Sequence, residues 1–226
     1  MPGRTQTLYR VDDATVRTLT DTPLALVPQS IQLVPRELIE DQAARQITDL
    51  YRSISGISFF RYTGVTLCGF CQENVLCDGL RGDSYAGFSV PQLFNIERVE
   101  VLKGPAGALY GGGDAGGVIN YVKRKLKATP QRRIELEAGN NDFRAESIEA
   151  TGPMSAAGNV RCRAGLYGDT EQGVRWNSDS ESVIGDASLA FHVGDTGQLT
   201  RSSPTSPRTW APTARVAGRW TTTAVF

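Results

Sequence analysis

The chain has 226 residues, enough for one or two domains with a buried core. Its 24 basic and 24 acidic side chains balance, so composition gives no indication of the positive surface that binds nucleic acid. No apolar run approaches the roughly 20 residues of a membrane-spanning helix, which leaves a soluble protein or a membrane protein built from β-strands.

The first 27 residues are polar, rich in Thr, Asp and Arg, and show no sustained periodicity. We therefore expect residues 1–27 to form a flexible arm. They also lack the apolar stretch of a secretory signal peptide, so no signal peptide is visible in the sequence as written.

An amphipathic helix is predicted over residues 35–55. Apolar residues recur there at steps of three or four, with most charged residues between them, which is the pattern of a helix that buries one face. These apolar residues are Leu38, Ile39, Ala43, Ile47, Leu50, Tyr51 and Ile54. Pro35 suits the first helical turn and Gly56 the C-cap, while the alternating residues 30–34 predict a short strand before the helix.

Short apolar runs at residues 65–70 and 74–77 predict strands, and Asp78 with Gly79 is a turn signal. A loop over residues 79–91 follows. It can present a cation and aromatic faces to a ligand, or it can be a solvated loop whose aromatic rings enter the core. The residues that would form such a binding loop are Arg81, Asp83, Tyr85 and Phe88.

Residues 95–125 predict a strand, a glycine-rich turn and a second strand. Val99 and Val101 alternate with charged residues, and residues 118–123 resume a β-branched run after the glycines. Gly111, Gly113 and Gly116 also satisfy the spacing of a dinucleotide-binding loop, but such a loop opens a helix, whereas these glycines lead into a strand signature. Clustered glycine in a tight turn is therefore the interpretation that we adopt.

This segment closely resembles the C-terminal half of the plug domain of TonB-dependent outer-membrane receptors. There the motifs I-E-R-V-E-V, K-G-P, L-Y-G and G-G-V-I-N occur in the same order as here. Earlier stretches of the chain, P-Q-S-I, V-P-R-E-L-I-E-D-Q and V-x-x-D-G, also resemble the family. The resemblance covers about residues 20–195 and is strongest between residues 74 and 123.

The resemblance implies an α+β plug domain, a small mixed sheet with helices, followed by antiparallel β-hairpins of an incomplete transmembrane β-barrel. It implies no cofactor and three partners: a ferric siderophore as the transported ligand, the TonB energy-coupling protein and outer-membrane lipid. Receptors of this type reside in the cell outer membrane. In such a receptor the plug fills a barrel, binds the chelate and is remodelled when TonB pulls an N-terminal box.

Three groups of residues acquire expected roles from this resemblance. The loop residues Arg81, Asp83, Tyr85 and Phe88 would contact the ferric chelate. Asp13, Ala14, Thr15 and Val16 are the nearest candidate for the TonB box, although an ordinary disordered terminus explains them as well. Glu97, Arg98 and Glu100 would join the plug to the barrel wall, or they are solvated strand charges.

The cysteines depart from the family pattern. Cys68 stands where an R-G-F motif has its arginine, and a thiol cannot supply the charge or donors of a guanidinium. Cys68 and Cys71 also form a C-x-x-C pair, which in a thiol oxidoreductase lies near a helix N-terminus. Here a strand and a turn are expected instead. A zinc site would need distant ligands such as Cys162 or His192.

The second half of the chain alternates between polar and apolar residues. Residues 133–139, 143–152, 160–168 and 182–193 each predict a strand, with short turns between them. Such segments are typical of a membrane β-barrel, and a soluble antiparallel sheet has the same period. The preceding plug-like segment favours the barrel.

From residue 201 onward Ser, Thr, Pro and Arg dominate, which predicts a disordered tail. One possible set of codons for residues 220–225, read one base earlier with a G before it, encodes Val-Asp-Asp-Asp-Gly-Arg, so a frameshift near residue 200 is a further hypothesis. The expected organisation is an arm (1–27), a plug domain (28–127), the first barrel strands (128–199) and a disordered or frameshifted tail (200–226).

The leading functional prediction is a fragment of a TonB-dependent ferric-siderophore receptor that does not itself transport. Its open strand edges would lack partners in a bilayer. The alternatives are a soluble plug-like module that still binds a ligand, and a C-x-x-C thiol oxidoreductase. No constellation for any other enzyme is present, and His192, the single histidine, is a poor basis for catalysis.

Overall fold

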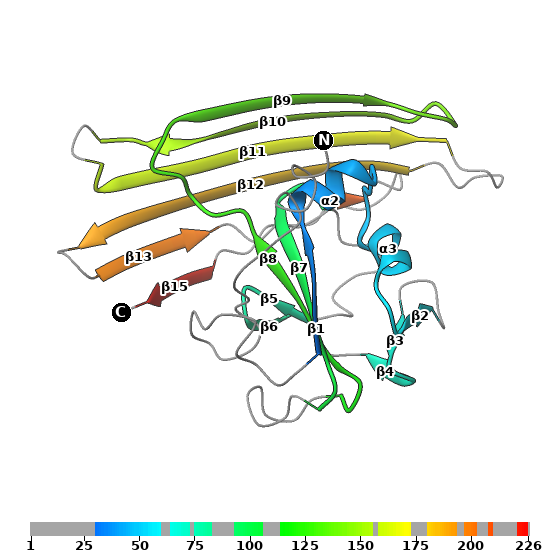
Figure 1. Ribbon diagram of the computed structural model, residues 1–226. Coiled ribbons are helices and arrows are strands. Elements are labelled where there is room, and N and C mark those ends of the chain that lie inside the picture. The colour runs from blue at the N-terminus through cyan, green and yellow to red at the C-terminus, as the bar shows by residue number, and fades with distance from the viewer. Residues whose placement is uncertain are drawn as a thin grey trace, which may run out of the picture. The chain divides into compact units, whose positions relative to one another are not determined.

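The computed structural model of the protein describes residues 30–59, 64–72, 75–82, 93–105, 114–155, 158–172, 180–193, 197–202, 208–209 and 221–225 (Figure 1). The chain divides into two compact units, residues 1–124 and residues 125–226. Within the described residues, no helix has the length and apolar character needed to cross a membrane.

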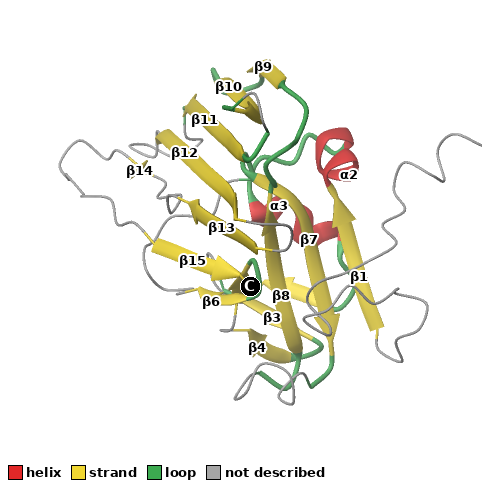
Figure 2. Cartoon of the chain, turned by 90° about the vertical axis from the view of Figure 1, so that its left-hand side faces the viewer, coloured by secondary structure: helices red, strands yellow, loops and turns green. Residues whose placement is uncertain are grey.

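The first unit is built on a five-stranded mixed sheet with the strand order β1-β7-β8-β5-β6. Its strands are β1 (Ser30–Pro35), β5 (Val75–Cys77), β6 (Leu80–Gly82), β7 (Ile96–Lys103) and β8 (Gly117–Lys123). Figure 2 shows β1, β7 and β8 side by side. Neighbouring strands run antiparallel, except that β5 runs parallel to β8. The strands that the sequence predicts on both sides of the glycine-rich turn are confirmed.

The core of the first unit lies around β7 and β8. Six of the seven residues of β8 are buried, so both faces of this strand are covered. Val99, Val101, Ile119 and Tyr121 belong to one cluster with residues of the helical segment. A small three-stranded sheet completes the unit, with strands β2 (Ile57–Phe59), β3 (Val65–Leu67) and β4 (Phe70–Gln72) in that order.

The single helix predicted over residues 35–55 is wrong. The structure has α2 (Arg36–Asp41), an irregular connection, α3 (Ile47–Leu50) and the 3-10 helix η2 (Tyr51–Ser53). The helix stops because Ala43 adopts a positive φ of 47°, and a new start follows in which Gln46 and Asp49 form a capping box. The apolar stripe survives this break, since Ile39, Ile47 and Leu50 are all buried.

Two glycines before and within β8 allow the backbone to approach its neighbours closely. A Cβ atom at Gly116 would collide with the carbonyl oxygen of Leu67, and one at Gly117 would collide with the carbonyl oxygen of Leu102. Gly117 also has a positive φ of 139°. The glycines of the G-G-V-I-N motif therefore permit close packing as well as a turn.

The second unit is an antiparallel sheet with the strand order β15-β13-β12-β11-β10-β9, and β14 pairs with β12. Its strands are β9 (Gln131–Ala138), β10 (Arg144–Pro153), β11 (Val160–Glu171), β12 (Ser180–Val193), β13 (Gly197–Ser202), β14 (Arg208–Thr209) and β15 (Thr221–Val225). The four alternating strands predicted from the sequence are confirmed as β9 to β12. The predicted fold class, a plug-like mixed sheet followed by antiparallel strands, is confirmed.

Some described residues after position 200 lie in strands, and the disordered or frameshifted tail stays a prediction. Thr221–Val225 forms β15 and pairs with β13. Three consecutive threonines and a valine favour extended backbone because their side chains branch at Cβ.

Candidate functional site

Most of the predicted binding residues lie outside the described residues. This holds for Asp13, Ala14, Thr15 and Val16, and for Asp83, Tyr85 and Phe88. Arg81 lies in β6, where its backbone pairs with Leu76 of β5. The described part of the candidate site is therefore the β5–β6 hairpin that leads into the loop.

The turn of this hairpin is tied to β8 by three hydrogen bonds. The Asp78 N–H donates to the Tyr121 carbonyl oxygen at 2.9 Å, and the Lys123 N–H donates to the Asp78 carboxylate at 2.9 Å. The Gly79 N–H donates to the Asn120 side-chain oxygen at 3.0 Å. Asp78 and Gly79 both have positive φ, which explains a D-G pair at this turn.

Asn120 continues these contacts toward β7. Its side-chain NH₂ donates to a Glu100 carboxylate oxygen at 3.1 Å, and the other carboxylate oxygen accepts from Arg98 Nε at 2.7 Å. Asn120 and Glu100 have no exposed surface. A carboxylate at such a position needs a cation and hydrogen-bond donors, and Arg98 and Asn120 supply them.

The structure places the three predicted plug–barrel residues at the start of β7. Arg98 and Glu100 form an ion pair with each other. The Oε2 atom of Glu97 lies 3.9 Å from Arg124 Nε, and Arg124 Nη2 lies 3.6 Å from Oε1 of Glu40. All these partners belong to the first unit, and a contact with a barrel wall stays a prediction for Glu97, Arg98 and Glu100.

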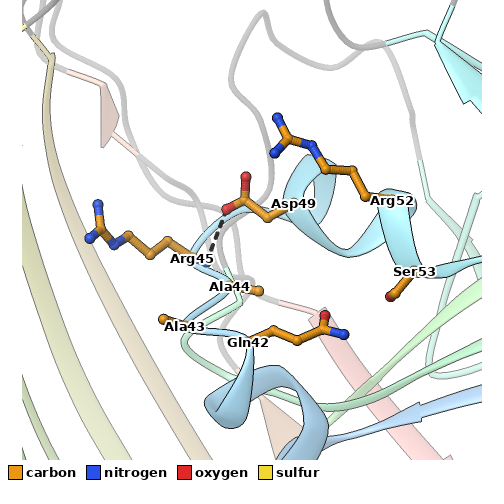
Figure 3. Close-up of a pocket in the computed structure, with 7 residues that line it drawn as sticks. All are labelled: Gln42, Ala43, Ala44, Arg45, Asp49, Arg52 and Ser53. Atoms are coloured by element: carbon orange, nitrogen blue, oxygen red, sulfur yellow. Dashed lines mark hydrogen bonds between the residues drawn. The ribbon is translucent and has the colours of Figure 1, made fainter.

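A polar pocket of about 520 Å³ lies at the break between α2 and α3 (Figure 3). The described residues that line it come from one stretch of the chain: Gln42, Ala43, Ala44, Arg45, Asp49, Arg52 and Ser53. The carboxylate of Asp49 accepts the backbone N–H of Arg45 at 3.1 Å and that of Gln46 at 3.0 Å, so it caps the helix. Sequence reasoning missed this pocket because a continuous helix would not contain it.

The four cysteines carry free thiols. Cys68 and Cys71 are exposed, and Cys68 begins the tight turn between β3 and β4 with a positive φ of 52°. The C-x-x-C pair therefore lies on a hairpin, as the sequence indicates, and not at the helix N-terminus that lowers a thiol pKa in oxidoreductases. In the part of the chain that the structure describes, no three potential ligands gather into a metal site.

The second unit presents two different faces. One face exposes large apolar side chains: Ile134, Leu136, Ile148, Leu166, Val183, Leu189 and Phe191. The other face holds a buried ion cluster in which Arg163 Nε donates to Glu149 at 2.9 Å and Arg163 Nη1 donates to Asp186. Sequence alternation indicated the two faces, but not this cluster, which joins three strands.

Comparison with known proteins identifies the first unit. Residues 23–118 match the family model described as TonB-dependent Receptor Plug Domain. The metal-pseudopaline receptor of Pseudomonas aeruginosa is 28% identical over 204 residues, which cover 86% of this chain and 28% of that receptor. The ferripyoverdine receptor of the same organism is 34% identical over 160 residues, which cover 67% of this chain and 20% of that receptor.

A solved structure extends the similarity to both units. The crystal structure of the ferripyoverdine receptor of the outer membrane of Pseudomonas aeruginosa, bound to ferripyoverdine, matches with a TM-score of 0.81 and 26% identity, over 86% of this chain and 27% of that one. The chain thus spans 20% to 28% of the length of the two curated relatives named above. It carries a TonB-dependent receptor plug domain, followed by antiparallel strands, and corresponds to the N-terminal part of such siderophore receptors.

Proposed function

We propose that this chain, whose first unit is a plug domain of the TonB-dependent receptor family, is part of an outer-membrane receptor that binds a ferric siderophore and takes it up with energy from TonB. The observation that carries this proposal is the match of both units, in order, to a receptor with its ferric chelate bound. The similar proteins are receptors and not enzymes.

The proposed ligand contacts are Arg81, Asp83, Tyr85 and Phe88. A ferric chelate is commonly anionic and often carries aromatic groups, so Arg81 would supply charge and donors while Tyr85 and Phe88 supply stacking surface. The hydrogen-bonded turn at Asp78 and Gly79 supports this assignment, because Arg81 follows it by two residues on a hairpin tied to β8.

The remaining roles follow the same division of the chain. Residues 1–27 would be the arm that contains the TonB contact at Asp13, Ala14, Thr15 and Val16, and residues 28–127 the plug. Residues 128–199 would be the first barrel strands, and residues 200–226 a tail. Glu97, Arg98 and Glu100 would join the plug to the wall. The exposed apolar face of β9 to β12 would contact outer-membrane lipid.

Calorimetry on the full chain in detergent tests the proposal. Ferripyoverdine should give saturable heat, whereas vitamin B12, a neutral corrinoid of comparable size, should give none. Arg81→Ala should weaken binding roughly tenfold or more, because a hydrogen bond to a charged group contributes about 1.5–3 kcal/mol. Arg132→Ala, at an exposed position of β9, is the matched control and should bind normally. Equal affinity in both variants would contradict the assignment of Arg81.

A further inference from the structure

The β5–β6 hairpin has little backbone pairing to hold it. Each strand has three residues, and β5 pairs with β8 over only three positions. β6 is the edge strand of the sheet and pairs only with β5 among the described strands. The position of this hairpin therefore depends strongly on the side-chain contacts at its turn.

The side chain of Asn120, on β8, links the turn of the β5–β6 hairpin to β7. Its oxygen accepts the Gly79 N–H and its NH₂ donates to Glu100. The chemistry fixes this orientation: a carboxylate accepts only, and a backbone N–H donates only, so the reversed amide would face both partners wrongly. Asn120 therefore fits between these two groups in a single way.

Glu100 in turn is held from the other side. Arg98 donates to it at 2.7 Å, and the Glu100 side chain has no exposed surface. Because a buried carboxylate tolerates few rearrangements, this ion pair fixes the oxygen to which Asn120 donates. The contacts form a continuous path from Arg98 through Glu100 and Asn120 to Gly79, which we call the Asn120 tether.

We propose that Asn120 and Glu100 are positioning residues for ligand binding: the Asn120 tether holds the β5–β6 hairpin so that Arg81, two residues beyond Gly79, meets the chelate. This inference rests on the proposed function. It assigns a role to Glu100, the second Glu of I-E-R-V-E-V, and to Asn120, the Asn of G-G-V-I-N. Both follow the Asp78–Gly79 turn in the sequence by 20 residues or more, and only the folded sheet connects them to it.

A reciprocal exchange of the two side chains tests the tether. Asn120→Asp places two buried carboxylates together, and Glu100→Gln replaces one acceptor oxygen by an NH₂ group, which then faces the donor of either Arg98 or Asn120. The double variant Asn120→Asp/Glu100→Gln restores all three bonds, and only the bond between positions 100 and 120 has its donor and acceptor reversed. The new amide at position 100 would then donate to the new carboxylate at position 120, which still accepts from Gly79. Arg98 would donate to the oxygen of that amide.

Hydrogen–deuterium exchange of the full chain measures, without any ligand, how firmly the Asn120 tether holds the hairpin. Each single variant should raise the exchange rate of the amides of residues 79–82 at least tenfold, and the double variant should return them to within about threefold of the unsubstituted chain. Ile39→Val is the control. It removes one methylene group from the core at α2 and should leave the exchange rates of residues 79–82 unchanged. Unchanged exchange in Asn120→Asp, or a double variant as fast as the singles, overturns the tether.

Ferripyoverdine calorimetry on the same variants reads the consequence for binding. Each single variant should lose affinity at least tenfold with unchanged stoichiometry, and the double variant should recover it. Faster exchange with unchanged affinity overturns the positioning role. If the unsubstituted chain binds no ferripyoverdine, the proposed function fails for this chelate, whereas the exchange pattern still supports or overturns the tether.

Discussion

Two tyrosine hydroxyls meet inside the core of the first unit. Tyr51 and Tyr121 come from η2 and β8, are both buried, and place their hydroxyl oxygens 2.5 Å apart. Burial raises the pKa of Tyr51 to about 12, although the hydrogen bond with Tyr121 lowers it in part. Burial also raises the pKa of Tyr121 well above its usual value. Both hydroxyls therefore keep their protons at ordinary pH.

This pair predicts a loss of stability at high pH. An unfolded tyrosine has a pKa near 10, so the folded chain holds a proton between about pH 10 and pH 12 that the unfolded chain releases. The stability that this held proton contributes to the folded state is complete below pH 10 and is lost as the pH rises through 12. For Tyr51 alone the loss is roughly 3 kcal/mol. Urea unfolding followed by circular dichroism at pH 9 and pH 12 measures it.

Two variants separate this effect from other groups that titrate in the same range. The double variant Tyr51→Phe/Tyr121→Phe removes both hydroxyls together and should lose much less stability between pH 9 and pH 12. Tyr167→Phe, on β11 of the second unit, should show the full loss. An identical decrease in the free energy of unfolding for the unsubstituted chain and both variants would show that the buried pair is not the cause.

At the scale of the elements, the local sequence pattern was enough to predict a strand wherever the two faces of that strand differ in polarity. The alternation of Ile148 and Ala150 with Ser147 and Glu149 predicted β10, because exposed and buried positions follow the pleat. Periodicity could not reveal the break at Ala43, since the apolar stripe continues across it. It also could not place Asn120 beside Gly79, 41 residues earlier in the chain, because only the parallel pairing of β5 with β8 brings them together.

Arg163 connects three neighbouring strands of the second unit. It lies on β11, donates to Glu149 on β10 and to Asp186 on β12, and its side chain is 1% exposed. The side chains of Glu149 and Asp186 are also largely buried. Removal of the cation would leave two carboxylates in a buried setting without their shared charge partner.

We therefore expect Arg163→Met to destabilise the second unit by about 3–5 kcal/mol. Urea unfolding of the full chain in detergent micelles measures the change. The triple variant Arg163→Met/Glu149→Gln/Asp186→Asn removes the charges together and should recover most of the loss. Arg132→Met, at an exposed position, should have almost no effect. A midpoint for Arg163→Met equal to that of Arg132→Met would refute the role of the cluster.

At the scale of the whole molecule, the two units bury apolar surface differently. The first unit has an apolar core of its own, in which Leu50, Leu67, Val99 and Ile119 are almost fully buried. The second unit keeps polar and charged groups on one face and exposes large apolar side chains on the other. An exposed apolar band of this kind calls for an apolar surrounding, because soluble proteins seldom leave such a surface in water.

Leu166 lies within this band, on β11, and is 53% exposed, while the adjacent Tyr167 points to the opposite face. If the band contacts lipid, Leu166→Arg places a charge in hydrocarbon at a cost of about 2–4 kcal/mol near the bilayer centre. Association of the full chain with phosphatidylcholine vesicles, measured by flotation, should then fall at least tenfold. Tyr167→Arg adds the same charge on the polar face and should associate nearly as well as the unsubstituted chain. Equal loss in both variants would show that charge alone matters, and not the face that carries it.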